Sequence, residues 1–83
     1  MRIIDVRTKE EYDDGHIKDA ELFDIMDMMY GKFPEIPKDE EIILYCESGS
    51  RATIAKSMME QNGFKNVKNG GGIDDMISNG YKC

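Results

Sequence analysis

One short segment of the chain gathers the residues best suited to chemistry, residues 46–51, with the sequence CESGSR. It follows an apolar run, residues 42–44, and precedes a stretch with helical periodicity. A thiolate is a strong nucleophile, and the start of a helix presents unpaired N–H groups and partial positive charge that stabilise an anion. Gly49 lets the backbone turn its amides toward the sulfur, and Arg51 adds a fixed cation with forked donors. The segment therefore predicts a nucleophilic Cys46 inside a cradle for an anionic sulfur, formed by Glu47, Ser48, Gly49, Ser50 and Arg51.

The elements that would position this segment alternate along the chain. Short apolar runs predict strands at residues 3–6, 20–23, 41–45 and 66–68. The pair Thr8 and Glu11 matches a capping box, which starts a helix. Helical stripes are expected at Ile25, Met28 and Met29, at Ala52, Ala55, Met58 and Met59, and at Ile73, Met76 and Ile77. Residues 70–72, all glycine, are expected to form a tight turn.

Strands that alternate with helices are typical of an α/β protein. We therefore expect one domain, residues 1–83, with a small parallel sheet of about four strands flanked by helices. Functional sites in such sheets gather at the carboxyl ends of the strands. Cys46 lies at one of these ends in the predicted arrangement.

Charge and hydropathy exclude several classes of partner. The net charge is −6, and residues 1–40 hold twelve acidic and six basic residues, whereas residues 41–83 hold five of each. This acidic first half argues against nucleic acid or an anionic membrane as the partner. No apolar stretch approaches ~18 residues, which predicts no membrane span. Asp5 interrupts the place where a secretion signal would be apolar, so we expect a cytoplasmic protein.

The two cysteines and the single histidine do not form a recognisable scaffold. Disulfide-rich domains and zinc sites use closely spaced cysteines or grouped histidines, and neither pattern is present. Cys83 is the last residue and is interpreted as a spectator, with a bridge to Cys46 as the weaker alternative. His16 is interpreted as a structural residue, with a base for Cys46 as its alternative role.

Three motifs in the expected order make the chain resemble the rhodanese family. Residues 3–7, IIDVR, followed by Glu11-Tyr12 and Gly15-His16-Ile17, are similar to the first signature of the family. Residues 46–52 resemble its active-site loop, and residues 63–67 with 71–73 resemble its closing segment. The family usually has a strand and a helix before the first signature, which this chain lacks. The resemblance therefore implies either a minimal or a truncated version of the rhodanese-like fold, with an uncovered sheet edge, and either a monomer or a weak homodimer.

The resemblance also implies an activity. Single-domain rhodaneses are sulfurtransferases that carry sulfane sulfur as a cysteine persulfide, here on Cys46. The donor would be a compound such as thiosulfate, and the acceptor cyanide, a thiol or a protein sulfur carrier. No metal or organic cofactor is required. Asp5, Arg7 and Glu11 are expected to form a supporting ion-pair network. The carboxylate of Glu47 next to the nucleophile predicts that thiosulfate, a dianion, is a poor donor.

Two alternatives belong to other functional classes. Rhodanese-like domains without the cysteine act as interaction or regulatory modules, and the presence of Cys46, Gly49 and Arg51 argues against that role here. Related phosphatases and arsenate reductases use a longer loop between cysteine and arginine. Only the four residues 47–50 separate them in this chain, which favours sulfur over phosphate.

Overall fold

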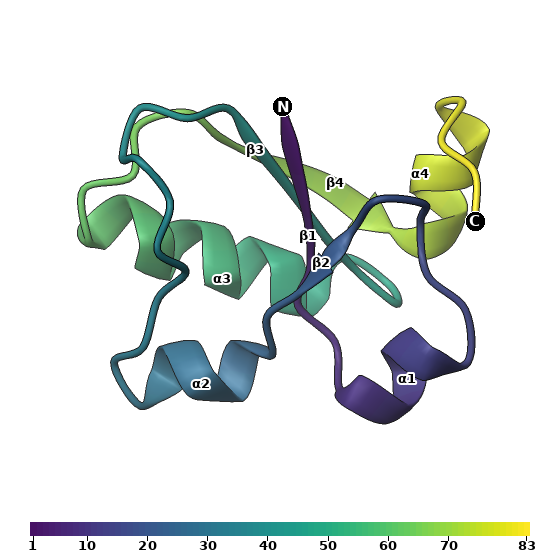
Figure 1. Cartoon of the computed structure of the whole chain (residues 1–83), viewed down its shortest axis with the longest axis horizontal. Helices are drawn as coiled ribbons and strands as arrows, with labels where there is room; N and C mark the ends of the chain where they lie inside the picture. Colours follow the sequence, from purple (N-terminus) through teal and green to yellow (C-terminus); the bar gives the residue numbers. More distant parts are fainter.

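The computed structural model describes residues 1–83, and the chain alternates short strands and helices (Figure 1). The longest helix has 12 residues, and no helix is both long enough and apolar enough to cross a membrane. In chain order the elements are β1 (Arg2–Asp5), α1 (Lys9–Asp13), β2 (Glu21–Leu22), α2 (Ile25–Met29), β3 (Ile42–Cys46), α3 (Ser50–Gln61), β4 (Val67–Gly72) and α4 (Ile73–Ser78).

The four strands form one parallel sheet in the order β2-β1-β3-β4. The register places Asp5, the last residue of β1, opposite Tyr45 of β3. The carboxyl ends of the two central strands therefore lie side by side, and Cys46 follows Tyr45 at that edge. The predicted α/β class with a small parallel sheet is confirmed.

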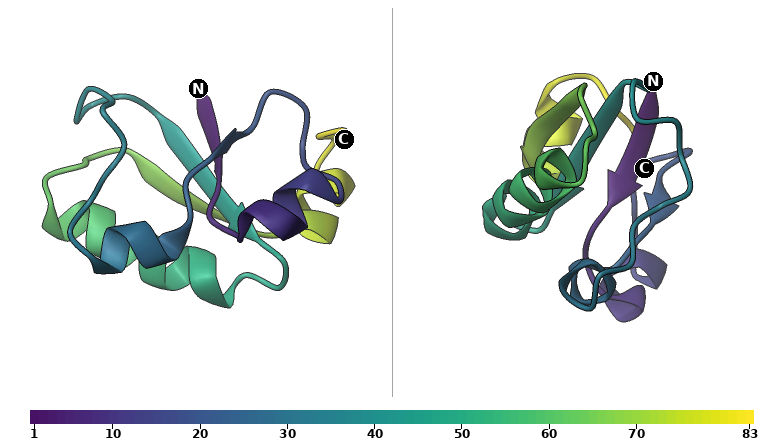
Figure 2. Two further views of the ribbon diagram at one scale, coloured as in Figure 1. Left: turned by 60° about the horizontal axis from the view of Figure 1, so that its bottom comes forward. Right: turned by 90° about the vertical axis from the view of Figure 1, so that its left-hand side faces the viewer.

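Helices cover the sheet on two faces (Figure 2). On the face that carries the larger part of the core, α2 and α3 pack against the strands through Ile25, Met28, Ala52, Ala55 and Met59. The alanines allow α3 to approach the sheet closely, and both are fully buried. On the other face, α4 packs through Met76 next to Tyr45 and Ile17. The predicted stripe on α2 is wrong at Met29, which is 55% exposed.

The glycines at positions 70–72 do not form the predicted tight turn, because they continue β4. Leu44 pairs with Asn69 and Cys46 pairs with Gly72, so β4 holds one residue more than β3 between these two pairs. An extra residue on one strand is a β-bulge, and a glycine with positive φ is one way to form it. Gly71 has φ 83°, which meets that need. The bulge brings β4 against the loop that follows Cys46.

Candidate active site

The Cys46 loop joins the buried strand β3 to the start of α3. Its sulfur accepts a hydrogen bond from the Gly49 N–H, with the two heavy atoms 2.9 Å apart. Gly49 has φ 102°, a conformation that side chains disfavour, and this turn directs its amide at the sulfur. No side chain caps the first turn of α3. The Gly49 amide is therefore the one backbone donor of the loop that contacts the Cys46 sulfur, and the wider cradle of residues 47–51 stays a prediction.

The Cys46 side chain is closed off from solvent. Its exposed fraction is 0%, and it packs with Ala52 of α3 and the apolar residues of β3. Gly72 of β4 lies so close to the loop that an added Cβ would clash with the carbonyl oxygen of Glu47. Gly49 likewise faces Gly71, whose Cα would lie 3.4 Å from an added Cβ. The glycines of β4 thus form a backbone surface on which the Cys46 loop rests.

Arg51, in the first turn of α3, forms a forked ion pair with Glu11 of α1. Its two terminal nitrogens donate to the two carboxylate oxygens, at 2.6 Å and 2.9 Å. The hydrogen bond from Arg51 is the main cause that lowers the pKa of Glu11, from 4.5 to about 2. Glu11 also accepts from the Thr8 N–H in the predicted capping box, which the structure confirms. A guanidinium has five donors, so Arg51 keeps donors for an anion beside this pair.

Asp5 and Arg7 form a buried pair at the end of β1. Arg7 is 3% exposed and Asp5 is 0% exposed. The arginine donates to both oxygens of the carboxylate, with the shortest distance 2.7 Å, and this hydrogen bonding raises the pKa of Arg7. The Tyr45 hydroxyl donates to the same carboxylate at 2.9 Å, and burial raises the pKa of Tyr45. Glu11 pairs with Arg51 and not with Asp5 or Arg7, so the expected three-residue network divides into two ion pairs.

Glu47 directs its carboxylate toward Arg7. The distance between Glu47 Oε1 and Arg7 Nη1 is 3.4 Å, and the Glu47 side chain is 57% exposed. Arg7 makes shorter bonds to Asp5 and to the Gly15 carbonyl, each at 2.7 Å. Because the arginine is already neutralised by Asp5, it compensates the charge of Glu47 only in part.

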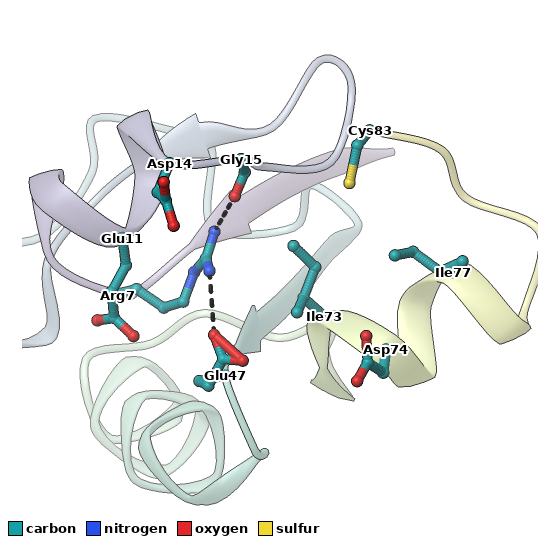
Figure 3. A pocket seen from close by; sticks show the side chains of 9 residues that line it. All are labelled: Arg7, Glu11, Asp14, Gly15, Glu47, Ile73, Asp74, Ile77 and Cys83. Carbon is teal, nitrogen blue, oxygen red and sulfur yellow. Dashed lines mark hydrogen bonds and ion pairs between the residues drawn. The ribbon is translucent and has the colours of Figure 1, made fainter.

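A cavity of about 300 Å³ opens beside this residue (Figure 3). Arg7, Glu47 and the end of α1 form one side, and α4 forms the other. The cavity contains one basic side chain and four acidic ones, Glu11, Asp14, Glu47 and Asp74. Ile73 and Ile77 supply apolar surface, and Cys83 lies at the rim.

The remaining cysteine and the histidine have separate positions. Cys83 is exposed and unbridged, and the chain before it is held by a hydrogen bond from the Lys18 N–H to the Lys82 carbonyl, at 2.6 Å. The His16 ring stacks on Tyr12 with ring centres 3.7 Å apart, and its Nδ1 lies 2.8 Å from the Tyr12 carbonyl oxygen. The His16 ring does not form a hydrogen bond with Cys46. This geometry agrees with the structural role that the sequence suggested.

Sequence reasoning missed the acidic cavity wall that α4 contributes. The available signal was Asp74, the second residue after the fourth strand, which ends at the same edge of the sheet as Cys46. Asp14 offered no such signal, because it follows the first helix and not a strand. Neither residue belongs to a motif, and only the folded chain brings them to the Cys46 loop.

Comparison with known proteins shows the family to which the chain belongs. Residues 1–77 match the model of the Rhodanese-like domain family. A sulfurtransferase of Allochromatium vinosum is 38% identical over 67 residues, which cover 81% of this chain and 62% of that protein. The thiosulfate sulfurtransferase PspE of Escherichia coli is 28% identical over 74 residues, which cover 88% of this chain and 71% of that protein. The chain thus spans about two thirds of the length of these relatives.

A solved structure extends the comparison to the fold. The Rhodanese_3 like domain of the Alr3790 protein from Anabaena sp. is 26% identical and superposes with a TM-score of 0.86. The alignment covers 99% of this chain and 95% of that domain. The sheet and its helices therefore have the same arrangement in both proteins.

Proposed function

This chain belongs to the rhodanese-like domain family, and on that premise we propose that it is a sulfurtransferase that carries sulfane sulfur on Cys46. The observation that supports the proposal most strongly is the hydrogen bond from the Gly49 amide to the Cys46 sulfur, at 2.9 Å, in the loop between β3 and α3. A donor aimed at the sulfur stabilises the thiolate and, after transfer, the persulfide anion. The names of two relatives, sulfurtransferase and thiosulfate sulfurtransferase, agree with this chemistry.

The reaction proceeds in two substitutions at sulfur. The Cys46 thiolate attacks the outer sulfur of a donor such as thiosulfate, a new S–S bond forms, and sulfite leaves with the electrons of the broken S–S bond. The thiolate of the acceptor then attacks the outer sulfur of the persulfide and releases the Cys46 thiolate. Covalent relay of this kind divides one difficult transfer into two easier steps. No metal or organic cofactor takes part in either step.

The loop residues have complementary roles in this scheme. The amides of residues 47–51 surround the outer sulfur, and the free donors of Arg51 attract an anionic donor. The Asp5–Arg7 pair fixes the neighbouring end of β1 and keeps the loop in position.

Acceptors of two kinds fit the proposal, small thiols and protein sulfur carriers. A putative sulfur carrier protein, YrkF of Bacillus subtilis, is 33% identical over 69 residues, and these cover 37% of that protein. A rhodanese-like unit thus occurs within a longer protein whose name refers to sulfur carriage.

Transfer of sulfur from thiosulfate to cyanide tests the proposed function. The product thiocyanate is measured with the native protein and with Cys46→Ser, and folding of both is checked by circular dichroism. We expect thiocyanate from the native protein only. If the native protein is folded and gives no thiocyanate with thiosulfate or with a persulfide donor, the result supports the non-enzymatic interaction module.

A further inference from the structure

We propose that the cavity beside the Cys46 loop selects, as sulfur acceptor, a small thiol that carries a positively charged amine. This inference rests on the proposed sulfurtransferase function and specifies the class of its second substrate.

The position of the cavity connects it to the reaction. Glu47 is the residue after Cys46, and its side chain forms part of the cavity wall. The other walls come from α1 and α4, which lie near the same edge of the sheet. An acceptor held there is adjacent to the loop that carries the persulfide. A volume of about 300 Å³ accommodates a small organic thiol, since one water takes about 30 Å³ in the liquid.

The charges in the cavity favour a cation. Of its four carboxylates, Glu11 pairs with Arg51 at 2.6 Å, and Glu47 makes a longer contact with Arg7 at 3.4 Å. Asp14 and Asp74 make no side-chain hydrogen bond or ion pair, and Glu47 shares Arg7 with Asp5. The charge of Arg7, the single arginine of the cavity, is therefore balanced by Asp5, which does not line the cavity. The remaining carboxylates line the cavity without such a partner. A protonated amine lowers the energy of this arrangement, whereas a second carboxylate raises it.

The cavity also has the apolar surface that a thiol needs. Ile73 and Ile77 of α4 line the side opposite Arg7. An aminothiol has a short apolar stem between its two ends. The ammonium group can lie near one of the cavity's carboxylates while the sulfur faces the Cys46 loop.

The test compares three small thiols of different charge on persulfide-loaded protein. Cysteamine is cationic, 2-mercaptoethanol is neutral, and 3-mercaptopropionate is anionic. The persulfide is formed with excess thiosulfate, its added mass is confirmed, and its loss is followed by mass spectrometry. Because an amine also changes the reactivity of its own thiol, each rate is divided by the rate of the same thiol with a variant protein.

The variants are Asp14→Asn and Asp74→Asn, which each remove one charge from the cavity, and Glu35→Gln as a matched control. Glu35 is exposed, lies in the segment before β3, and is not part of the cavity. We expect each Asn variant to slow discharge by cysteamine about three- to tenfold, the effect of one charge at about 6 Å in a largely solvated site. Discharge by 2-mercaptoethanol should be unchanged, and discharge by 3-mercaptopropionate should become faster. The control should alter none of the three rates.

Salt provides a second measurement on the native protein alone. Raising the ionic strength should lower the rate with cysteamine and raise the rate with 3-mercaptopropionate, because screening weakens both interactions. If the persulfide forms but the two Asn variants and salt change all three rates equally, or change none, the charge selection is wrong and the sulfurtransferase function stands. If no persulfide forms on the folded native protein with thiosulfate or with a persulfide donor, the proposed function itself is overturned, and this inference with it.

Discussion

Arg51 holds the carboxylate of Glu11 through two parallel hydrogen bonds, although the two residues are 40 positions apart. The pair joins the first turn of α3, where the Cys46 loop ends, to the first turn of α1. It therefore fixes the direction in which α3 leaves the loop. Arg51 is also the only cation of the loop. The same side chain therefore positions the loop and supplies its positive charge.

This pair predicts a loss of stability in acid. The pKa of Glu11 in the folded protein is about 2, below the 4.5 of an ordinary glutamate, so the stabilisation is complete above pH 4.5. It is lost as the pH falls from 4.5 toward 2, because the carboxylate must then be protonated. Both side chains are about a third exposed, 33% and 29%, and solvent screening reduces the contribution to about 1 kcal/mol.

Urea unfolding of the native protein and of Glu11→Gln between pH 6 and pH 2 measures this contribution. We expect the native protein to be more stable by about 1 kcal/mol at pH 6, and the difference to shrink toward pH 2. Glu60→Gln serves as the control. Glu60 forms an ion pair with Lys56 one turn away on the surface of α3. A difference between native protein and Glu11→Gln that is the same at every pH would show that the pair does not stabilise the fold electrostatically.

Gly72 is predicted to position the Cys46 loop through the absence of a side chain. An added Cβ at Gly72 would clash with the backbone of Glu47, and backbone cannot move without displacing the loop. Gly72→Ala should therefore lower kcat/KM for sulfur transfer at least about tenfold and lower stability by about 1–3 kcal/mol, as overpacking does.

Gly70→Ala is the matched control in the same strand. The atoms nearest to a Cβ at Gly70 belong to the side chains of Met76 and Ile43, which can shift. We expect this variant to lose stability without a tenfold loss of kcat/KM once it is folded. Equal kinetic losses in the two folded variants would remove Gly72 from the positioning of the loop.

Glu47 is predicted to make thiosulfate a poor donor. Its carboxylate faces the cavity beside Cys46, and Arg7 compensates its charge only in part. At about 6 Å one like-charge pair costs on the order of 0.7–3 kcal/mol, so kcat/KM for thiosulfate is lowered from a few-fold to about a hundredfold. Glu47→Gln should raise kcat/KM for thiosulfate, and Glu47→Lys should raise it further.

Steady-state kinetics at low and high salt check this prediction, with Glu35→Gln as the control for an equal change in net charge. Added salt should increase turnover by the native protein, because screening relieves the repulsion, and should decrease turnover by Glu47→Lys. If kcat/KM is the same for the native protein and both Glu47 variants, the residue has no role in donor choice.

The sequence predicted those parts of the molecule that depend on local patterns. The apolar run of β3, the capping box at Thr8 and the glycine at position 49 each have a physical consequence within a few residues, and each was placed correctly. The Cys46 loop was found for the same reason, since its chemistry is contiguous. Resemblance to a family extended this reading from the loop to the whole sheet.

The sequence did not reveal features that depend on how distant segments meet. Three consecutive glycines are equally suited to a turn and to a bulge, and only the pairing of Cys46 with Gly72 decides between them. The sequence analysis grouped Glu11 with Asp5 and Arg7, and only the folded chain shows that Arg51 is its partner. The acidic cavity depends on residues of α1 and α4 that no motif connects.

The central claim, that Cys46 carries the transferred sulfur, is tested most directly by the mass of the intact protein after incubation with thiosulfate. The native protein and Cys83→Ser should each gain the mass of one sulfur atom, and a thiol added afterwards should remove it. Cys46→Ser should gain nothing while remaining folded. The account would be contradicted if folded Cys46→Ser still gained sulfur, or if folded Cys83→Ser failed to gain it.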